Sequence, residues 1–166
     1  MLGHMATKIR IVGSVGSGKT TLARKLALQK GISMYSLDDV VWSRSTIGDC
    51  RNSEELRDAK LQAILSEPSW IIEGAHLGWS LKTFEEADQI FFLHPSLPVR
   101  IYRISRRFLQ QKRGIEHASY TPTWKMYSRM FKWTYQYETI YKKQVRAILK
   151  NSKNAIEIRD GSELGV

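Results

Sequence analysis

The sequence predicts an α/β fold in which helices cover both faces of a parallel β-sheet, a three-layer sandwich. Strand-like and helix-like segments alternate along the 166 residues, as they do when crossover helices join parallel strands. Several of the strand-like segments are almost continuously apolar, which is typical of strands buried on both faces. The length fits a single domain spanning residues 1–166.

Five strands and five helices are expected, in alternating order. The expected strands are residues 8–12, 32–37, 70–72, 89–93 and 155–159. The expected helices are residues 20–30, 53–66, 81–87, 100–113 and 123–150. Gly31 ends the first helix, Ser53 begins the second as a polar cap, and Pro98 opens the fourth. The long last helix carries an apolar stripe at three- and four-residue spacing, and residues 43–52 are expected to form a polar loop.

Residues 13–20 read GSVGSGKT, a complete GxxxxGK[ST] phosphate loop between the first strand and the first helix. Backbone N–H groups and the positive helix end at such a loop bind nucleotide phosphates. Lys19 is expected to reach the β- and γ-phosphates, and the Thr20 hydroxyl to bind Mg²⁺. A Gly/Ser-rich turn could match the pattern by chance, but strand, loop and helix occur in the required order. The expected nucleotide-binding residues are Gly13, Ser14, Gly16, Ser17, Gly18, Lys19, Thr20 and Thr21.

Acidic residues follow the second and third expected strands, where ligands bind in open parallel sheets. Asp38 is the candidate to contact the group that accepts a phosphate, and Glu73 the candidate carboxylate near Mg²⁺. The next residue, Asp39, is expected to face the opposite way from Asp38, because alternate side chains of an extended backbone point to opposite sides. The alternative interpretations are a helix cap or Asx-turn for Asp38 and a surface carboxylate at a turn for Glu73.

Positive charge is concentrated in one segment. Residues 100–150 contain 13 lysines and arginines but only two acids, Glu116 and Glu138, whereas the whole chain has a net charge of +10. A polyanion is therefore expected to approach this segment, and nucleotides and nucleic acid both qualify. Trp124, Trp133 and Tyr135 lie among these cations and could stack nucleobases, or serve in packing or a dimer surface.

The remaining composition favours a cytoplasmic protein. The single cysteine, Cys50, excludes an internal disulfide framework and fits a reducing compartment. No apolar run approaches the ~18 residues of a membrane span, so no membrane association is expected. Residues 1–4 are interpreted as a vector-derived leader.

Four stretches together resemble the P-loop nucleoside and nucleotide kinases of the adenylate kinase type. They read GSVGSGKTTLARKLA, SLDDVVW, WIIEG and ADQIFFLHPSLPVRIYRISRR, and the resemblance covers Ile9 to about Arg113. The pattern is similar to the small DNA topology modulation (FlaR-related) proteins. This resemblance implies a P-loop NTPase sheet of five strands in the order 2-3-1-4-5. Glu73 and His94 stand where that subgroup carries aspartates.

The same resemblance favours Arg103 and Arg107 as lid arginines that neutralise charge during transfer, within a lid region of residues 103–122. A solvated basic helix face is the alternative. Apart from His4 in the expected leader, the histidines His76, His94 and His117 are scattered, so no metal site is expected from them.

These observations predict a phosphotransferase that uses ATP and Mg²⁺ and moves the γ-phosphoryl group to a small acceptor, a nucleoside or nucleotide. ATP is favoured over GTP because the chain has no N-K-x-D motif, and the adenine is expected near residues 160–162. The rival hypothesis is a nucleic-acid-binding protein regulated by ATP, and a third is a kinase acting on polynucleotide ends. The oligomeric state stays open between monomer and homodimer.

Overall fold

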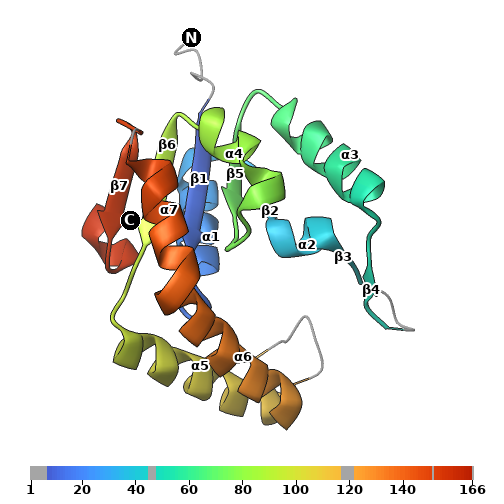
Figure 1. The fold of residues 1–166 in the computed structure, drawn as a ribbon, viewed down its shortest axis with the longest axis vertical. Coiled ribbons are helices and arrows are strands. Elements are labelled where there is room, and N and C mark those ends of the chain that lie inside the picture. The colour runs from blue at the N-terminus through green and yellow to red at the C-terminus, as the bar shows by residue number, and fades with distance from the viewer. Residues whose placement is uncertain (1–6, 45–47, 117–121, 151, 166) are drawn as a thin grey trace.

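The main sheet consists of five parallel strands in the order β2-β5-β1-β6-β7 (Figure 1). The computed structural model describes residues 7–44, 48–116, 122–150 and 152–165. The strands are β1 (Lys8–Gly13), β2 (Met34–Ser36), β5 (Trp70–Glu73), β6 (Gln89–Leu93) and β7 (Ala155–Ile158). The predicted α/β class is confirmed. The strand numbers differ in detail from 2-3-1-4-5 because two short strands that were not predicted precede β5, but the five sheet strands have the expected neighbours.

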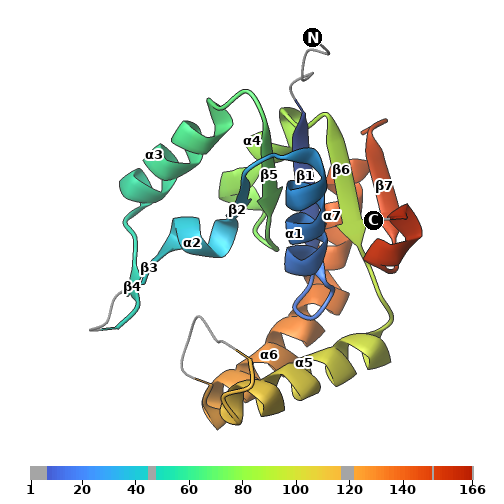
Figure 2. The same ribbon diagram turned by 180° about the vertical axis from the view of Figure 1, so that it is seen from behind.

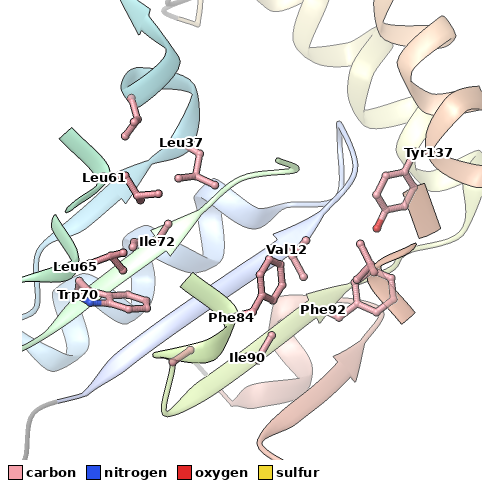
Figure 3. Close-up of a cluster of buried hydrophobic side chains, with 13 residues drawn as sticks. Val12, Leu37, Leu61, Leu65, Trp70, Ile72, Phe84, Ile90, Phe92 and Tyr137 are labelled. Atoms are coloured by element: carbon pink, nitrogen blue, oxygen red, sulfur yellow. The ribbon is translucent and has the colours of Figure 1, made fainter. Parts of the chain in front are cut away.

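Helices cover both faces of this sheet. Helix α1 (Lys19–Lys30) packs Leu22, Ala23 and Leu26 against one face, and Figure 2 shows it in front of β1. The opposite face is covered by α3 (Glu54–Leu65), α4 (Lys82–Glu85) and α7 (Lys142–Leu149). Figure 3 shows this second cluster, in which the buried Trp70 and Phe92 of the sheet lie among helix side chains. Because alternate strand residues point to opposite faces, each buried strand supplies both clusters.

Two further helices form an antiparallel hairpin beyond the carboxyl end of the sheet (Figures 1 and 2). Helix α5 (Leu97–Lys112) and helix α6 (Trp124–Gln136) are held together by aromatic rings. The Phe108 ring centroid lies 4.5 Å from that of Tyr127 and 5.0 Å from that of Trp124. Offset aromatic contacts of this kind add to the area that the rings bury. The hairpin therefore brings the basic residues of α5 alongside the phosphate loop.

The predicted long helix 123–150 is divided by a π-helical turn, η2 (Tyr137–Tyr141), between α6 and α7. Thr123 caps its start, since its side chain accepts a hydrogen bond from the Met126 backbone N–H. Such single π-turns are frequent at functional sites. Here the turn buries Tyr137 and directs Glu138 toward α5.

The predictions for residues 32–52 were wrong in two places. Asp38 and Asp39 lie in a short helix, α2 (Leu37–Val41), because Leu37, Val40 and Val41 bury one helical face. The expected loop 43–52 contains an antiparallel pair, β3 (Trp42–Ser43) and β4 (Cys50–Arg51). The Asn52 side chain closes this ribbon by donating to the Val40 carbonyl oxygen at 2.8 Å.

The expected leader, residues 1–4, and residues 117–121 of the expected lid, with His117, lie outside the described residues. Within the described ranges, no helix has the length and apolar character needed to cross a membrane.

Candidate active site

The phosphate loop connects β1 to α1 at the carboxyl edge of the sheet. Gly13 is tightly enclosed, since a Cβ there would lie 2.6 Å from the Leu93 carbonyl oxygen and 2.7 Å from Ser17 Oγ. Gly18 precedes α1 with a φ of 96°, in the left-handed region that disfavours a side chain. Gly16 and Ser17 lie between them. The loop backbone therefore adopts a conformation at Gly13 and Gly18 that residues with a Cβ atom would disfavour.

Lys19 and Thr20 open α1 and connect the loop to neighbouring strands. Lys19 Nζ donates to the Ser14 carbonyl oxygen at 2.8 Å. Burial lowers the pKa of the Lys19 ammonium, an effect that the carboxylates of Glu73 and Asp38 oppose. Thr20 Oγ1 donates to Glu73 Oε1 at 3.2 Å, and Glu73 is buried at the end of β5. The hydroxyl and the carboxylate predicted at Mg²⁺ are thus adjacent.

A smaller cavity of about 420 Å³ borders the loop at Gly16, Ser17, Gly18 and Thr21. Three arginines of α5, Arg103, Arg106 and Arg107, line the same cavity. Arg103 Nη1 donates to the Ser17 carbonyl oxygen at 3.3 Å, and its Nη2 donates to Asp160 Oδ2 at 2.5 Å. The cavity also reaches Gly161 and Ser162, the segment expected near adenine.

A larger cavity of about 1010 Å³ meets the loop at Ser14, Val15 and Lys19. Asp38 lies in this cavity, on α2, and its Oδ1 is 3.0 Å from His76 Nε2. That hydrogen bond holds the pKa of Asp38 below its ordinary value. Asp39 is exposed and lies 4.0 Å from Arg44, away from the cavity.

Aromatic side chains surround the larger cavity. Trp42, Trp79, Trp133, Tyr137 and Tyr141 come from β3, from η1 (Gly78–Ser80) and from the α6–η2 segment. Of the three aromatics considered for base stacking, Trp133 is the one that lines either of these two cavities. Trp124 packs on Phe108, and Tyr135 is exposed and borders neither cavity.

Sequence reasoning missed a buried arginine that connects the loop to the long helix. Arg100 is fully buried, and its Nη1 donates to Ser14 Oγ at 2.7 Å. Its Nη2 forms an ion pair with Glu138 in η2, and Glu138 also pairs with Lys142 at 3.3 Å. Both Arg100 and Glu138 stand in the basic segment, and Glu138 lies in the unexpected π-turn.

His94 follows β6 and lies apart from both cavities. Its ring stacks on Phe92, and the Nδ1 atom has no hydrogen-bond partner within the described ranges. Burial lowers the pKa of its imidazole. The structure therefore groups the predicted residues around the loop and leaves His94 outside.

Neither a protein-family model nor a curated protein matches the sequence. Solved structures do match. Shikimate kinase from Acinetobacter baumannii in complex with shikimate has a TM-score of 0.55 and 16% identity, over 97% of this chain and 89% of that chain. A gluconokinase from Sinorhizobium meliloti 1021 has a TM-score of 0.51 and 15% identity, over 96% and 87%. A sugar kinase from Janibacter sp. has a TM-score of 0.52 and 17% identity, over 96% and 90%. At this identity the likeness shows the fold, which is that of P-loop kinases.

Proposed function

We propose that this chain is a phosphotransferase that moves the γ-phosphoryl group of ATP to a small acceptor, a nucleoside or nucleotide. The observation that carries the proposal is the pair of cavities at the phosphate loop, which share no lining residue. The smaller one combines loop glycines with arginines, as a polyphosphate requires. The larger one combines Lys19 with the carboxylate of Asp38, as an acceptor hydroxyl requires.

The reaction assigns one role to each group of residues. The loop amides and Lys19 hold the β- and γ-phosphates, and Arg103 and Arg107 neutralise charge on the transferred group. The acceptor oxygen forms a bond to the γ-phosphorus while the bond from that phosphorus to the β,γ-bridging oxygen breaks, so that ADP leaves. Asp38 takes the hydroxyl proton and later releases it to water. The likeness to solved structures of kinases supports phosphoryl transfer as the reaction.

A magnesium ion fits the oxygen donors at the loop. Thr20 Oγ1 and Glu73 Oε1 lie 3.2 Å apart, and hydroxyl and carboxylate oxygens are the ligands that Mg²⁺ prefers. We assign Thr20 to the ion and Glu73 to its surroundings. When bound, the ion would neutralise phosphate charge.

The lining of the larger cavity favours a planar acceptor. Five aromatic side chains surround it, and the polar side chains of the lining are those of Ser14, Lys19, Asp38, Arg51, His76, Gln136 and Gln144. Aromatic faces stack on nucleobases at about 1–3 kcal/mol per base, and a sugar has no aromatic ring to stack on them. This composition supports a nucleoside or nucleotide over a sugar.

The test is transfer of label from [γ-³²P]ATP with Mg²⁺ to nucleosides, nucleoside monophosphates, sugars and 5′-hydroxyl oligonucleotides. We expect label on one nucleoside or nucleotide class, and none with Lys19→Ala. Label on a sugar would support the phosphotransferase activity but contradict a nucleoside or nucleotide as the acceptor. Release of inorganic phosphate alone, or no turnover, would contradict the proposal.

Nucleic-acid binding is a second candidate function. On α6, Lys125, Arg129 and Lys132 are exposed beside Trp124 and Tyr135, which are 66% and 70% exposed. Binding through six or more phosphates should weaken by roughly 10³-fold between 50 and 200 mM salt. Anisotropy titration of labelled DNA and RNA at both salt concentrations measures this, and no binding at 50 mM removes the candidate.

The resemblance to DNA topology modulation (FlaR-related) proteins, the cytoplasmic location and the monomeric or homodimeric state stay predictions from the sequence.

A further inference from the structure

The acceptor-side carboxylate has a histidine partner that the sequence left without a role. His76 Nε2 lies 3.0 Å from Asp38 Oδ1, and both residues line the larger cavity. We propose that His76 is a positioning residue of the transfer reaction, which holds Asp38 so that its second oxygen, Oδ2, meets the acceptor hydroxyl. This inference rests on the proposed function.

Asp38 needs such a partner because little else restrains it. Its side chain is 65% exposed, and α2 is only five residues long. Within the described part of the chain, the Asp38 carboxylate forms one hydrogen bond, from His76 to Oδ1, and its Oδ2 atom forms none. A carboxylate only accepts hydrogen bonds, so His76 Nε2 carries the proton between them. Oδ2 is then left to accept the proton of a hydroxyl group.

His76 is itself held at two points. Its backbone carbonyl oxygen accepts hydrogen bonds from Arg10 Nη2 at 3.1 Å and from Ser80 Oγ at 2.8 Å. Its ring packs on Trp79 with the centroids 5.4 Å apart. The hydrogen bonds therefore fix the backbone of His76, and the contact with Trp79 fixes the orientation of its imidazole ring.

The fixed backbone depends on a buried arginine in the central strand. Arg10 is fully buried in β1, and its guanidinium also donates to the carbonyl oxygens of Ile11, Ile72 and Gly74. Burial lowers the pKa of Arg10 to about 9, although Glu73 opposes the effect. Burying a charged group is costly unless it is hydrogen-bonded. The Arg10 guanidinium donates to the carbonyl oxygens of Ile72, Gly74 and His76, and these bonds fix the course of the segment that leaves β5. Arg10 thus connects β1 to the backbone of His76, and the His76 side chain connects that backbone to Asp38.

The charges around Asp38 keep it ionised and ready to accept a proton. Lys19 and Arg44 lie near it in addition to His76. Loss of His76 would leave these cations in place, so Asp38 would stay ionised but lose its direction. Misdirected carboxylates slow a reaction through geometry, and a displacement of about 1 Å can cost ~10²-fold in rate.

The experiment compares His76→Leu and His76→Gln, because a glutamine amide can still donate to a carboxylate. Initial rates of transfer to the acceptor identified by the panel give kcat and KM for acceptor and ATP. Asp39→Asn serves as the control, since this neighbouring carboxylate points away from the cavity. Thermal unfolding and the Kd for Mg·ATP are measured for every variant.

We expect His76→Leu to lower kcat by about 10- to 100-fold with the Kd for Mg·ATP unchanged. His76→Gln should recover kcat to within a few-fold, and Asp39→Asn should match the wild type. Equal kcat for His76→Leu and wild type overturns the role of His76 while the kinase stands. Equal losses with Leu and Gln, or a weaker Kd for Mg·ATP, also overturn it. Absence of transfer by the wild type to every acceptor overturns the proposed function and this role with it.

Discussion

The ion pair between Arg100 and Glu138 provides the sharpest test of how the long helix supports the phosphate loop. Glu138→Leu removes the carboxylate and keeps a side chain of similar volume in η2. The Arg100 guanidinium is then left fully buried beside Ser14, without an ion-pair partner among the described residues. We expect lower stability and weaker binding of Mg·ATP, because Arg100 positions the Ser14 hydroxyl in the loop.

The magnitude follows from the burial of the two partners. Breaking a buried pair by removing one partner costs roughly 3–5 kcal/mol. Glu138 is 26% exposed, so the expected loss lies at the lower end, about 3 kcal/mol. For a chain of this size, each kcal/mol corresponds to about 2–4 °C in Tm. The predicted decrease in Tm is therefore about 6–12 °C.

Thermal unfolding by circular dichroism measures this change, and Glu157→Leu is the matched control. Glu157 pairs with Arg146 at 2.8 Å, but both side chains are about half exposed. Exposed pairs contribute at most ~1 kcal/mol. A Glu138→Leu Tm no lower than that of the control would refute the reasoning. So would full additivity with Arg100→Met, because replacing both partners of a buried pair should cost less than the sum.

Two other predictions concern the edges of the proposed nucleotide site. Gly13→Ala should abolish binding of Mg·ATP, measured by calorimetry, because the new Cβ would lie 2.6 Å from a backbone oxygen; unchanged affinity would contradict the tight loop. For Asp160, hydrogen bonds from the Ser162 backbone N–H and from Arg103 lower the pKa to about 2 from an ordinary 3.8. A lowered acid pKa stabilises the fold above the ordinary value, and this stabilisation is lost as pH falls toward about 2. Asp160→Asn should therefore flatten the dependence of unfolding free energy on pH between about 4 and 2, whereas an unchanged slope would exclude this contribution.

The parts of the fold that are predictable from sequence have strong local signals. The strands β5 and β6 contain the apolar runs WII and IFFL, and β1 is mostly apolar apart from Lys8 and Arg10. Helix α3 follows its cap Ser53, whose side chain accepts a hydrogen bond from the Leu56 N–H at 3.2 Å. The phosphate loop is local as well, since eight consecutive residues specify it. Such elements need no knowledge of distant contacts.

The parts that sequence could not reveal depend on contacts between distant residues. Arg10 reads as an interruption in an apolar strand, and its four carbonyl partners are recognisable only in the folded sheet. His76 lies 38 residues from Asp38, and no spacing rule joins them. The π-turn in the long helix has no signal of its own, because Tyr137 fits the helical stripe with or without it. The strands β3 and β4 have two residues each, which is too short for an alternating pattern to mark them.

The separation of the two cavities bears on the kinetics of the proposed enzyme. The smaller cavity meets the loop at Gly16–Gly18 and the larger one at Ser14 and Lys19, so donor and acceptor would be bound together. A single direct displacement then needs no phosphorylated enzyme as an intermediate. Double-reciprocal plots at several acceptor concentrations should therefore intersect, as they do when a ternary complex forms, and should not run parallel as in a ping-pong scheme.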